Sequence, residues 1–178
     1  MNSNLSSELL PRLNALESEG AIRRLVARYF RICDNLGPDT SLEDLGELFT
    51  ADAKWEGKGR YKKAFGGYEG RDAIVAMIGS YCVPIPHFKM TSHFFSAEDI
   101  RVDDDIATGA WMMLQCSTYA DDTSDLRSAC LNLDFRNDDQ IWRISNFRST
   151  NIFARRVDGW TDSEDIPIPE NSKDGATR

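Results

Sequence analysis

The sequence predicts an α+β fold in which helices pack on one face of a curved antiparallel sheet. Two observations lead to this prediction. Apolar residues recur at helical spacing in the first half of the chain, and four long runs beyond Pro86 alternate as strands do. Helices and strands segregated in this way are typical of α+β domains. A chain of 178 residues suits one domain, which we expect to span residues 1–157, with a polar, flexible tail over 158–178.

Two helices are predicted in the first part of the chain. Residues 5–18 suit a short leading helix that ends near Glu19-Gly20. A stronger pattern follows, because six apolar residues fall at i, i+3, i+4, i+7, i+8 and i+11 and therefore share one face. This second helix should end before Gly37-Pro38. The residues of its apolar face are Ile22, Leu25, Val26, Tyr29, Phe30 and Cys33.

Shorter elements follow. The stretch SLEDLGELF (41–49) predicts a helix with Ser41 as its N-cap and Asp44 three residues further on. Residues 52–57 (DAKWEG) predict a short strand. The stretch YEGRDAIVAMIGSY predicts a further helix after a Gly-Gly turn.

The second half of the chain predicts an antiparallel meander. Turn-forming stretches rich in Asp, Asn and Ser separate long alternating runs, as expected for strands joined by tight turns. The predicted strands are residues 88–102, 106–119, 126–136 and 140–153.

Composition and charge argue against several classes of function. The net charge of −8 would repel nucleic acids and anionic membranes. No apolar run approaches the roughly 18–20 residues that cross a membrane, and the first residues lack a secretory pattern. Four widely spaced cysteines without a CxxC pair predict reduced thiols, and no glycine-rich phosphate loop or metal-ligand motif is present. We therefore expect a cytoplasmic protein that binds neither nucleic acid nor membrane.

Both histidines of the chain lie in one stretch, HFKMTSHFF (87–95). Histidine has the unperturbed pKa closest to neutral pH, so each is a candidate base. His87 follows Pro86 in a loop and is predicted to be solvated. His93 lies mid-strand, where alternation places it on one face with Thr91 and Phe95. A buried imidazole needs a hydrogen-bond partner, so His93 is either a core histidine bonded to a carbonyl or a base with an orienting group.

A candidate partner for His93 lies at the edge of the apolar face of the second helix. Asp34 falls in its last turn, where the helix dipole disfavours a carboxylate. This cost suggests that Asp34 accepts the imidazole N–H, although a solvated aspartate is the simpler alternative. Tyr29, well within the apolar face, is either a packed core residue or a proton or hydrogen-bond donor.

Several segments occur in an order typical of a known family over about residues 15–153. They are the helix I-x-x-L-x-x-x-Y-x-x-x-x-D, the segment LFTADAKW, the helix start Y-x-G-R-D-A-I, the strand segment T-S-H, and I-W-R-I-S near the end. Together they resemble the SnoaL-like group of the nuclear-transport-factor-2-like superfamily, and within it the scytalone dehydratases, bile acid 7α-dehydratases and hexachlorocyclohexane dehydrochlorinases. The resemblance implies a cone-shaped, curved antiparallel sheet with N-terminal helices that close a cavity.

The resemblance also implies a mechanism. These lyases use a histidine–aspartate dyad without a metal or an organic cofactor, and by position the dyad falls on His93 and Asp34, with an acid or polarising group at Tyr29. The implied substrate is a hydrophobic aromatic or alicyclic small molecule. The implied assembly is a homo-oligomer, a dimer or trimer formed through the outer face of the sheet.

One departure from the dehydrochlorinases bears on the leaving group. Where they keep an inward arginine on the last strand, this chain has Phe147, and alternation puts Arg148 on the opposite face. With Tyr29 as a donor and no inward arginine, loss of water fits better than loss of chloride. The residues expected to line the substrate site are Trp55, Phe88, Thr91, Phe95, Phe147, Ser149 and Asn151.

Two alternatives to a dehydratase remain open from the sequence. An isomerase or polyketide cyclase of the same fold would move a proton within its substrate with the same acid–base pair. A non-catalytic small subunit of a ring-hydroxylating dioxygenase would have the same fold without any chemistry.

Overall fold

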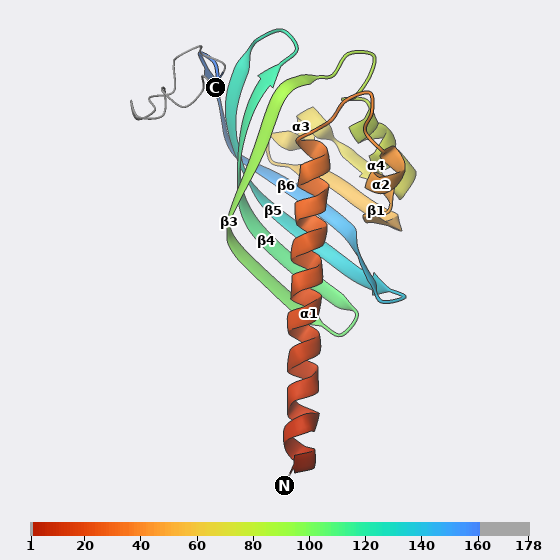
Figure 1. The fold of residues 1–178 in the computed structure, drawn as a ribbon. Helices are drawn as coiled ribbons and strands as arrows, with labels where there is room; N and C mark the ends of the chain where they lie inside the picture. The colour runs from red at the N-terminus through yellow and green to blue at the C-terminus, as the bar shows by residue number, and fades with distance from the viewer. Residues whose placement is uncertain (1, 161–178) are drawn as a thin grey trace, which may run out of the picture.

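The computed structural model describes residues 2–160. A long N-terminal helix lies across the concave face of a curved six-stranded sheet, and the shorter helices pack beside its C-terminal half (Figure 1). The predicted α+β class and the helix-covered curved sheet are thus confirmed. The elements are α1 Asn2–Cys33, α2 Leu42–Gly46, β1 Phe49–Lys58, α3 Tyr61–Phe65, β2 Gly67–Glu69, α4 Arg71–Gly79, β3 Phe88–Asp103, β4 Ile106–Tyr119, β5 Ser124–Asp138 and β6 Ile141–Val157.

The sheet is mixed, whereas the sequence predicted a wholly antiparallel one. Its strand order is β2-β1-β6-β5-β4-β3, and β3 to β6 form the predicted antiparallel meander. β1, however, pairs in parallel with β6. The reason lies in the connection after β1, which carries the chain through α3, β2 and α4 to the far edge of the sheet. The meander then returns β6 alongside β1, running in the same direction.

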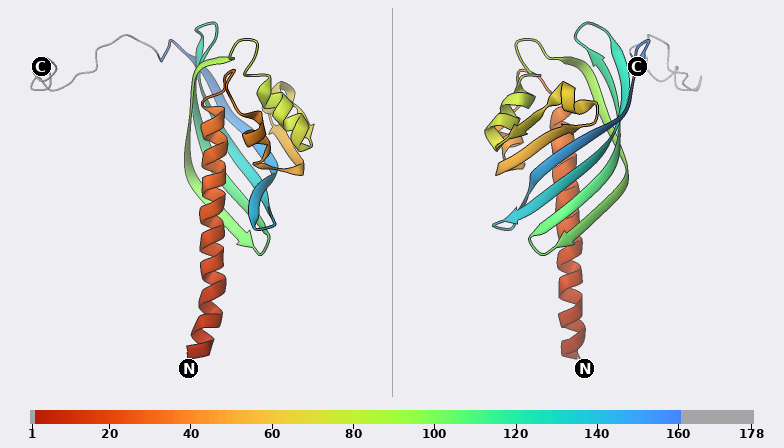
Figure 2. Two further views of the ribbon diagram at one scale, coloured as in Figure 1. Left: turned by 45° about the vertical axis from the view of Figure 1, so that its right-hand side comes forward. Right: turned by 180° about the vertical axis from the view of Figure 1, so that it is seen from behind.

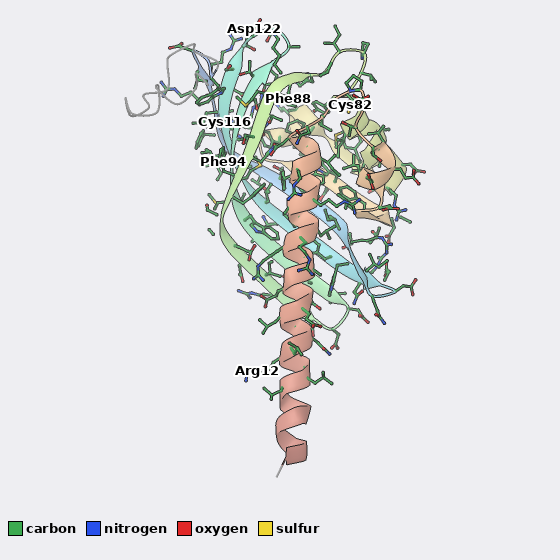
Figure 3. The ribbon with its side chains drawn as sticks, viewed as in Figure 1. Arg12, Cys82, Phe88, Phe94, Cys116 and Asp122 are labelled. Carbon is green, nitrogen blue, oxygen red and sulfur yellow. The ribbon has the colours of Figure 1, made fainter. Side chains whose placement is uncertain are left out.

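α1 is one continuous helix of 32 residues, so the predicted break near Glu19-Gly20 is wrong. A glycine inside a helix costs only about 1 kcal/mol relative to alanine. Glu19 offsets part of that cost, because its carboxylate accepts a hydrogen bond from Arg23 one turn later at 2.9 Å. The N-terminal half of α1 extends beyond the sheet (Figure 2). Arg12 lies on this overhanging part (Figure 3), as do the exposed residues Leu9, Leu10, Leu13 and Leu16.

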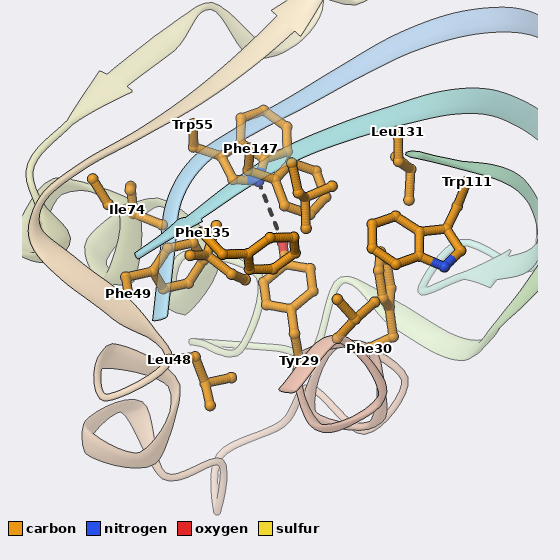
Figure 4. Packing of buried hydrophobic residues seen from close by; sticks show 14 of the residues in the cluster. Tyr29, Phe30, Leu48, Phe49, Trp55, Ile74, Trp111, Leu131, Phe135 and Phe147 are labelled. Carbon is orange, nitrogen blue, oxygen red and sulfur yellow. Dashed lines mark hydrogen bonds between the residues drawn. The ribbon is translucent and has the colours of Figure 1, made fainter. Parts of the chain in front are cut away.

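The C-terminal half of α1 supplies one side of the core. Four residues of the predicted apolar face are buried, namely Ile22, Val26, Tyr29 and Phe30, whereas Leu25 and Cys33 are only partly buried. Figure 4 shows Tyr29 and Phe30 of α1 facing Phe147 and other large side chains of the sheet. Burial of each large apolar side chain contributes about 1.5–3 kcal/mol, so this face holds the helix on the sheet.

The short elements follow the predictions in part. Ser41 caps α2, with its Oγ accepting the backbone N–H of Asp44 at 3.1 Å. Arg71, at the start of α4, donates from Nε and Nη2 to the carbonyl of Phe49 at 3.0 and 2.7 Å, which ties this helix to the beginning of β1. α3 and β2 were not predicted, and β1 begins three residues before the predicted strand and ends one residue after it.

β3 bends where its regular pairing is interrupted. The register of β3 with β4 shifts between Ser96 and Asp99, and Ala97 has a positive φ of 52°. Such bulges increase the local twist and bend of a strand, which helps the sheet to curve around α1. The predicted alternation of β3 holds from Thr91 to Phe95 and ends at this bulge, beyond which Ala97 is exposed.

Two predictions concern the ends of the chain and the membrane. Within residues 2–160, no helix is both long enough and apolar enough to span a membrane. Most of the tail predicted over 158–178 lies outside the described residues, which end at Trp160.

Candidate active site

A cavity of about 170 Å³ lies between the C-terminal part of α1 and the concave face of the sheet. Aromatic rings from α1, β1, α3, β3, β4 and β6 form most of its wall, and α4 contributes Met77 and Ile78. A volume of this order suits a ligand of about one ring. The polar or ionisable groups in the wall, apart from the tyrosines, are Cys33, His87, His93, Gln115, Arg127 and Ser149.

His93 and Asp34, two of the residues singled out from the sequence, are in direct contact. The Nδ1 of His93 lies 2.5 Å from Oδ1 of Asp34, and the backbone N–H of His93 donates to Oδ2 at 3.4 Å. Both oxygens of the carboxylate are therefore directed at one residue. The His93 side chain is 10% exposed and that of Asp34 is 25% exposed. With Nδ1 as the donor to Asp34, Nε2 is the unprotonated nitrogen of a neutral imidazole, and no side chain among residues 9–160 forms a hydrogen bond with it.

The packing of α1 on β3 explains why two residues 59 positions apart meet. α1 ends at Cys33, so Asp34 is the first residue beyond it, and its N–H still donates to the carbonyl of Phe30 at 2.8 Å. Phe30 packs against Phe95 at 4.2 Å between ring centroids, and against the imidazole of His93 at 5.0 Å. Further along α1, Arg23 donates to Glu98 of β3 at 2.6 Å.

Tyr29 is buried in the cavity wall. Trp55 donates its Nε1–H to the phenolic oxygen at 3.3 Å, the contact drawn as a dashed line in Figure 4. The phenol's own hydrogen therefore remains available for another acceptor, and the neighbouring thiol of Cys33 is a weak one. Burial raises the pKa of Tyr29 well above its ordinary value, so the phenol stays protonated across the usual pH range.

Four of the seven residues predicted to bind substrate line the cavity, namely Trp55, Phe88, Phe147 and Ser149. Phe88 lies on β3 near the C-terminal end of α1 (Figure 3). The rings of Trp55 and Phe147 are stacked, with centroids 5.5 Å apart and planes 7° apart, and they form a flat face of the wall. A planar ring bound there would find a parallel surface.

The other three predicted residues lie outside the cavity wall. Thr91 is buried beneath it and accepts a hydrogen bond from Gln115 at 3.3 Å. The ring of Phe95 is covered by α1. Asn151 pairs opposite Ala129, as Ser149 pairs opposite Leu131, so the alternation holds as far as this residue. Its amide nevertheless donates to the carbonyl of Phe153 at 2.9 Å, and the side chain does not line the cavity.

An arginine faces the cavity, contrary to the interpretation drawn from Phe147. Arg148 does lie outside, where its guanidinium donates to both oxygens of Asp134 at 2.8 and 2.6 Å. The cation in the cavity is instead Arg127 of β5, which the sequence analysis missed. The run from Arg127 through Ala129 and Leu131 alternates with period two, so the signal for an inward residue was present but not used.

His87 is exposed as the sequence suggested, but its ring also lies in the cavity wall, 5.1 Å from Tyr81 and 5.2 Å from Tyr119 between centroids. In the part of the chain that the structure describes, no three histidine, cysteine or acidic side chains are grouped to hold a metal ion. All four cysteines are free thiols there.

Solved structures with this fold include several enzymes. A hexachlorocyclohexane dehydrochlorinase from Novosphingobium barchaimii has a TM-score of 0.66 at 19% identity over 86% of this chain and 97% of that one. A scytalone dehydratase-like protein from Novosphingobium aromaticivorans has a TM-score of 0.66 at 19% identity over 84% and 97% of the two chains. An NTF2-like protein with a cystatin-like fold from the same species has a TM-score of 0.64 at 26% identity over 90% and 93%. These similarities establish a shared fold.

Sequence comparison gives a family but no individual relative. No curated protein is similar enough to the chain to count as a match. Residues 14–148 match the SnoaL-like domain, which is more than half of the chain and runs from within α1 to within β6. The chain therefore belongs to the family of SnoaL-like domains, as its sequence motifs suggested.

Proposed function

We propose that the protein is a lyase that removes water from a hydrophobic cyclic small molecule, with His93 as its base. The observation that carries the proposal is the contact of Asp34 with Nδ1 of His93 in the wall of an apolar cavity. A carboxylate at Nδ1 selects the tautomer in which Nε2 is unprotonated and holds the ring in one orientation. An oriented base beside an apolar cavity with few polar groups is suited to proton abstraction from carbon.

The proposed reaction needs no group beyond these side chains. Nε2 of His93 takes a proton from a carbon next to the carbon that bears a hydroxyl group. The electron pair of the broken C–H bond forms the double bond as the C–O bond breaks. The imidazolium, stabilised by Asp34, returns its proton to the departing oxygen, so water leaves and His93 is neutral again.

Tyr29 assists this reaction as a hydrogen-bond donor and not as a source of a full proton. Its burial raises its pKa well above the ordinary value, which makes the phenolate costly to form. A protonated phenol can still donate a hydrogen bond to the leaving oxygen or to a substrate carbonyl, where negative charge develops. The bond from Trp55 at 3.3 Å fixes the phenolic oxygen for this role.

The structural relatives support the reaction class. They include a protein described as a dehydrochlorinase and one described as scytalone dehydratase-like, and elimination is common to both descriptions. We prefer loss of water to loss of halide because a protonated phenol and an imidazolium are suited to a leaving hydroxyl group. The preference for loss of water over loss of halide no longer rests on the lack of a cation in the cavity, because Arg127 lies in the cavity wall.

The test is a screen of cyclic hydroxy compounds with an activated neighbouring C–H bond, followed by mass spectrometry in deuterated water. A dehydratase gives a product lighter by one water, whereas an isomerase gives a product of unchanged mass that has exchanged with solvent. Turnover should survive dialysis against a chelator, whichever of the two reactions the protein catalyses. Turnover that is equal in wild type and in His93→Ala would end the proposal.

We also propose that the protein forms a homo-oligomer through the outer face of the sheet. Exposed apolar side chains gather there on neighbouring strands, where Phe94 pairs opposite Leu114 and Met112 lies two residues away on the same strand. Apolar patches of this kind commonly mark interfaces. Sedimentation should show a dimer or trimer that Phe94→Glu dissociates, whereas a wild-type monomer would contradict this assignment.

A further inference from the structure

Three polar residues form a row across the concave face of the sheet. His93 of β3 pairs opposite Gln115 of β4, and Gln115 pairs opposite Arg127 of β5. All three line the cavity. Neighbouring strands lie about 4.8 Å apart, so the backbone of Arg127 is roughly 10 Å from that of His93. A ligand of one ring bound between them would have one end at the imidazole and the other at the guanidinium.

The guanidinium of Arg127 is held in place by one edge and one face. Its Nε donates to Oδ2 of Asp125 at 2.5 Å, and the hydroxyl of Tyr119 donates to the same oxygen at 2.9 Å. The ring of Tyr119 lies against the guanidinium, with the central carbon 5.7 Å from the ring centroid. Among residues 9–160, no side chain or carbonyl accepts from Nη1 or Nη2.

Arg127 and Arg148 pair with their aspartates in different ways. Both side chains are 27% exposed and each pairs with an aspartate. Arg148 donates from both Nη atoms to both oxygens of Asp134, which is the bidentate geometry that a structural ion pair prefers. Arg127 donates only from Nε and leaves Oδ1 of the buried Asp125 without a partner. The ion pair with Asp125 therefore leaves both Nη atoms of Arg127 unused.

We propose that Arg127 binds a carboxylate of the substrate, which makes the substrate a cyclic hydrophobic acid. Two parallel N–H groups of a guanidinium match the two oxygens of a carboxylate, and their interaction is strong where apolar walls exclude water. The carboxylate lies at the end of the molecule remote from the C–H bond that faces His93. This assignment of substrate class rests on the proposed function, whereas the binding of an organic acid at Arg127 does not.

The experiment compares benzoate with its uncharged counterpart benzamide. Binding to the intact protein is followed by NMR through the indole N–H of Trp55, which lies in the cavity wall. Wild type should bind benzoate more tightly than benzamide. Arg127→Gln should weaken benzoate binding about 10- to 100-fold and leave benzamide unchanged, which is the range for a hydrogen-bonded charge. Arg148→Gln is the matched control with the same charge change on the outer face, and it should alter neither affinity.

A second variant guards against misfolding of Arg127→Gln. Arg127→Lys keeps the charge but loses the paired N–H groups, so benzoate binding should fall about tenfold while benzamide is unaffected. Equal affinity for both ligands in wild type, no binding of benzoate, or equal loss in Arg127→Gln and Arg148→Gln would each overturn the proposal. Failure of the proposed function would be seen separately, as turnover retained in His93→Ala while benzoate binding still depends on Arg127.

Discussion

The two histidines differ in what holds their rings, although both lie in the wall of the same cavity. His93 is held by Asp34 at 2.5 Å and is largely enclosed. His87 is exposed, and its imidazole contacts only the aromatic rings of Tyr81, Phe88 and Tyr119, while its backbone is fixed by Tyr81 and Ala120. Aromatic contacts place a ring without selecting its tautomer. Proximity to the cavity is therefore not sufficient for a base, which also needs an orienting acceptor.

The largest effect is expected from His93→Ala. Removal of a general base typically lowers turnover about 10²- to 10⁴-fold, and we expect a loss in this range. The fold should survive, because the side chain is at the cavity wall and α1 is held by the apolar core. Circular dichroism and steady-state kinetics on a confirmed substrate provide the measurement.

Asp34→Asn should cost nearly as much. An amide at this position can present its own N–H to Nδ1 and thereby favour the tautomer that carries its proton on Nε2, where the base must be free. We expect kcat to fall while substrate affinity changes little. A variant with full activity would show that Asp34 only anchors the backbone N–H of His93.

Tyr29→Phe should reduce turnover about 10²-fold, which is typical for loss of one hydrogen-bond donor to developing charge. The ring is retained, but the indole N–H of Trp55 loses its acceptor, which costs about 1 kcal/mol of stability. The melting temperature should therefore fall by a few degrees. Unchanged turnover together with this lower melting temperature would reduce Tyr29 to a structural role.

The smallest effect is expected from His87→Ala. The ring is exposed and donates to no carboxylate in the described part of the chain, so turnover should stay within about twofold of wild type, as for most surface substitutions. The ratio of the effects of His93→Ala and His87→Ala measures how far the two histidines differ in function. If the two losses were equal, the contrast between the histidines would have no functional meaning.

Local patterns predicted much of the fold, while the errors came from long-range pairing. The alternation of apolar and polar residues was sufficient to predict the four strands of the meander. The helical spacing of apolar residues from Ile22 to Cys33 was sufficient to predict the buried half of α1. Nothing local distinguishes a parallel from an antiparallel neighbour for β1, because the partner strand lies about a hundred residues away. The break expected at Gly20 was wrong because one glycine costs a helix only about 1 kcal/mol, and the ion pair of Glu19 with Arg23 offsets part of that cost.

The site was predictable only where regular geometry holds. Helical spacing and strand alternation put Asp34 at a boundary and His93 on the inner face, and the structure brings these two residues together. Asn151 continues the alternation of Phe147 and Ser149 yet lies outside the cavity wall, because alternation gives the face of a strand and not how far along it a cavity extends. The inner face of Arg127 could have been predicted from its alternation with Ala129 and Leu131, whereas its position opposite Gln115 depends on a register that the sequence of one strand does not give.

The parallel pairing of β1 with β6 has a consequence for the order in which the molecule assembles. Phe49 pairs with Ile144, so this contact closes a far longer loop than any turn of the meander. Contacts of large sequence separation cost more chain entropy and form late. The stack of Trp55 on Phe147 belongs to this pairing, so the flat wall of the cavity is completed last. By the same reasoning β1 and its helices are the first part to open in the native state, and hydrogen exchange should be faster in β1 than in β4 or β5.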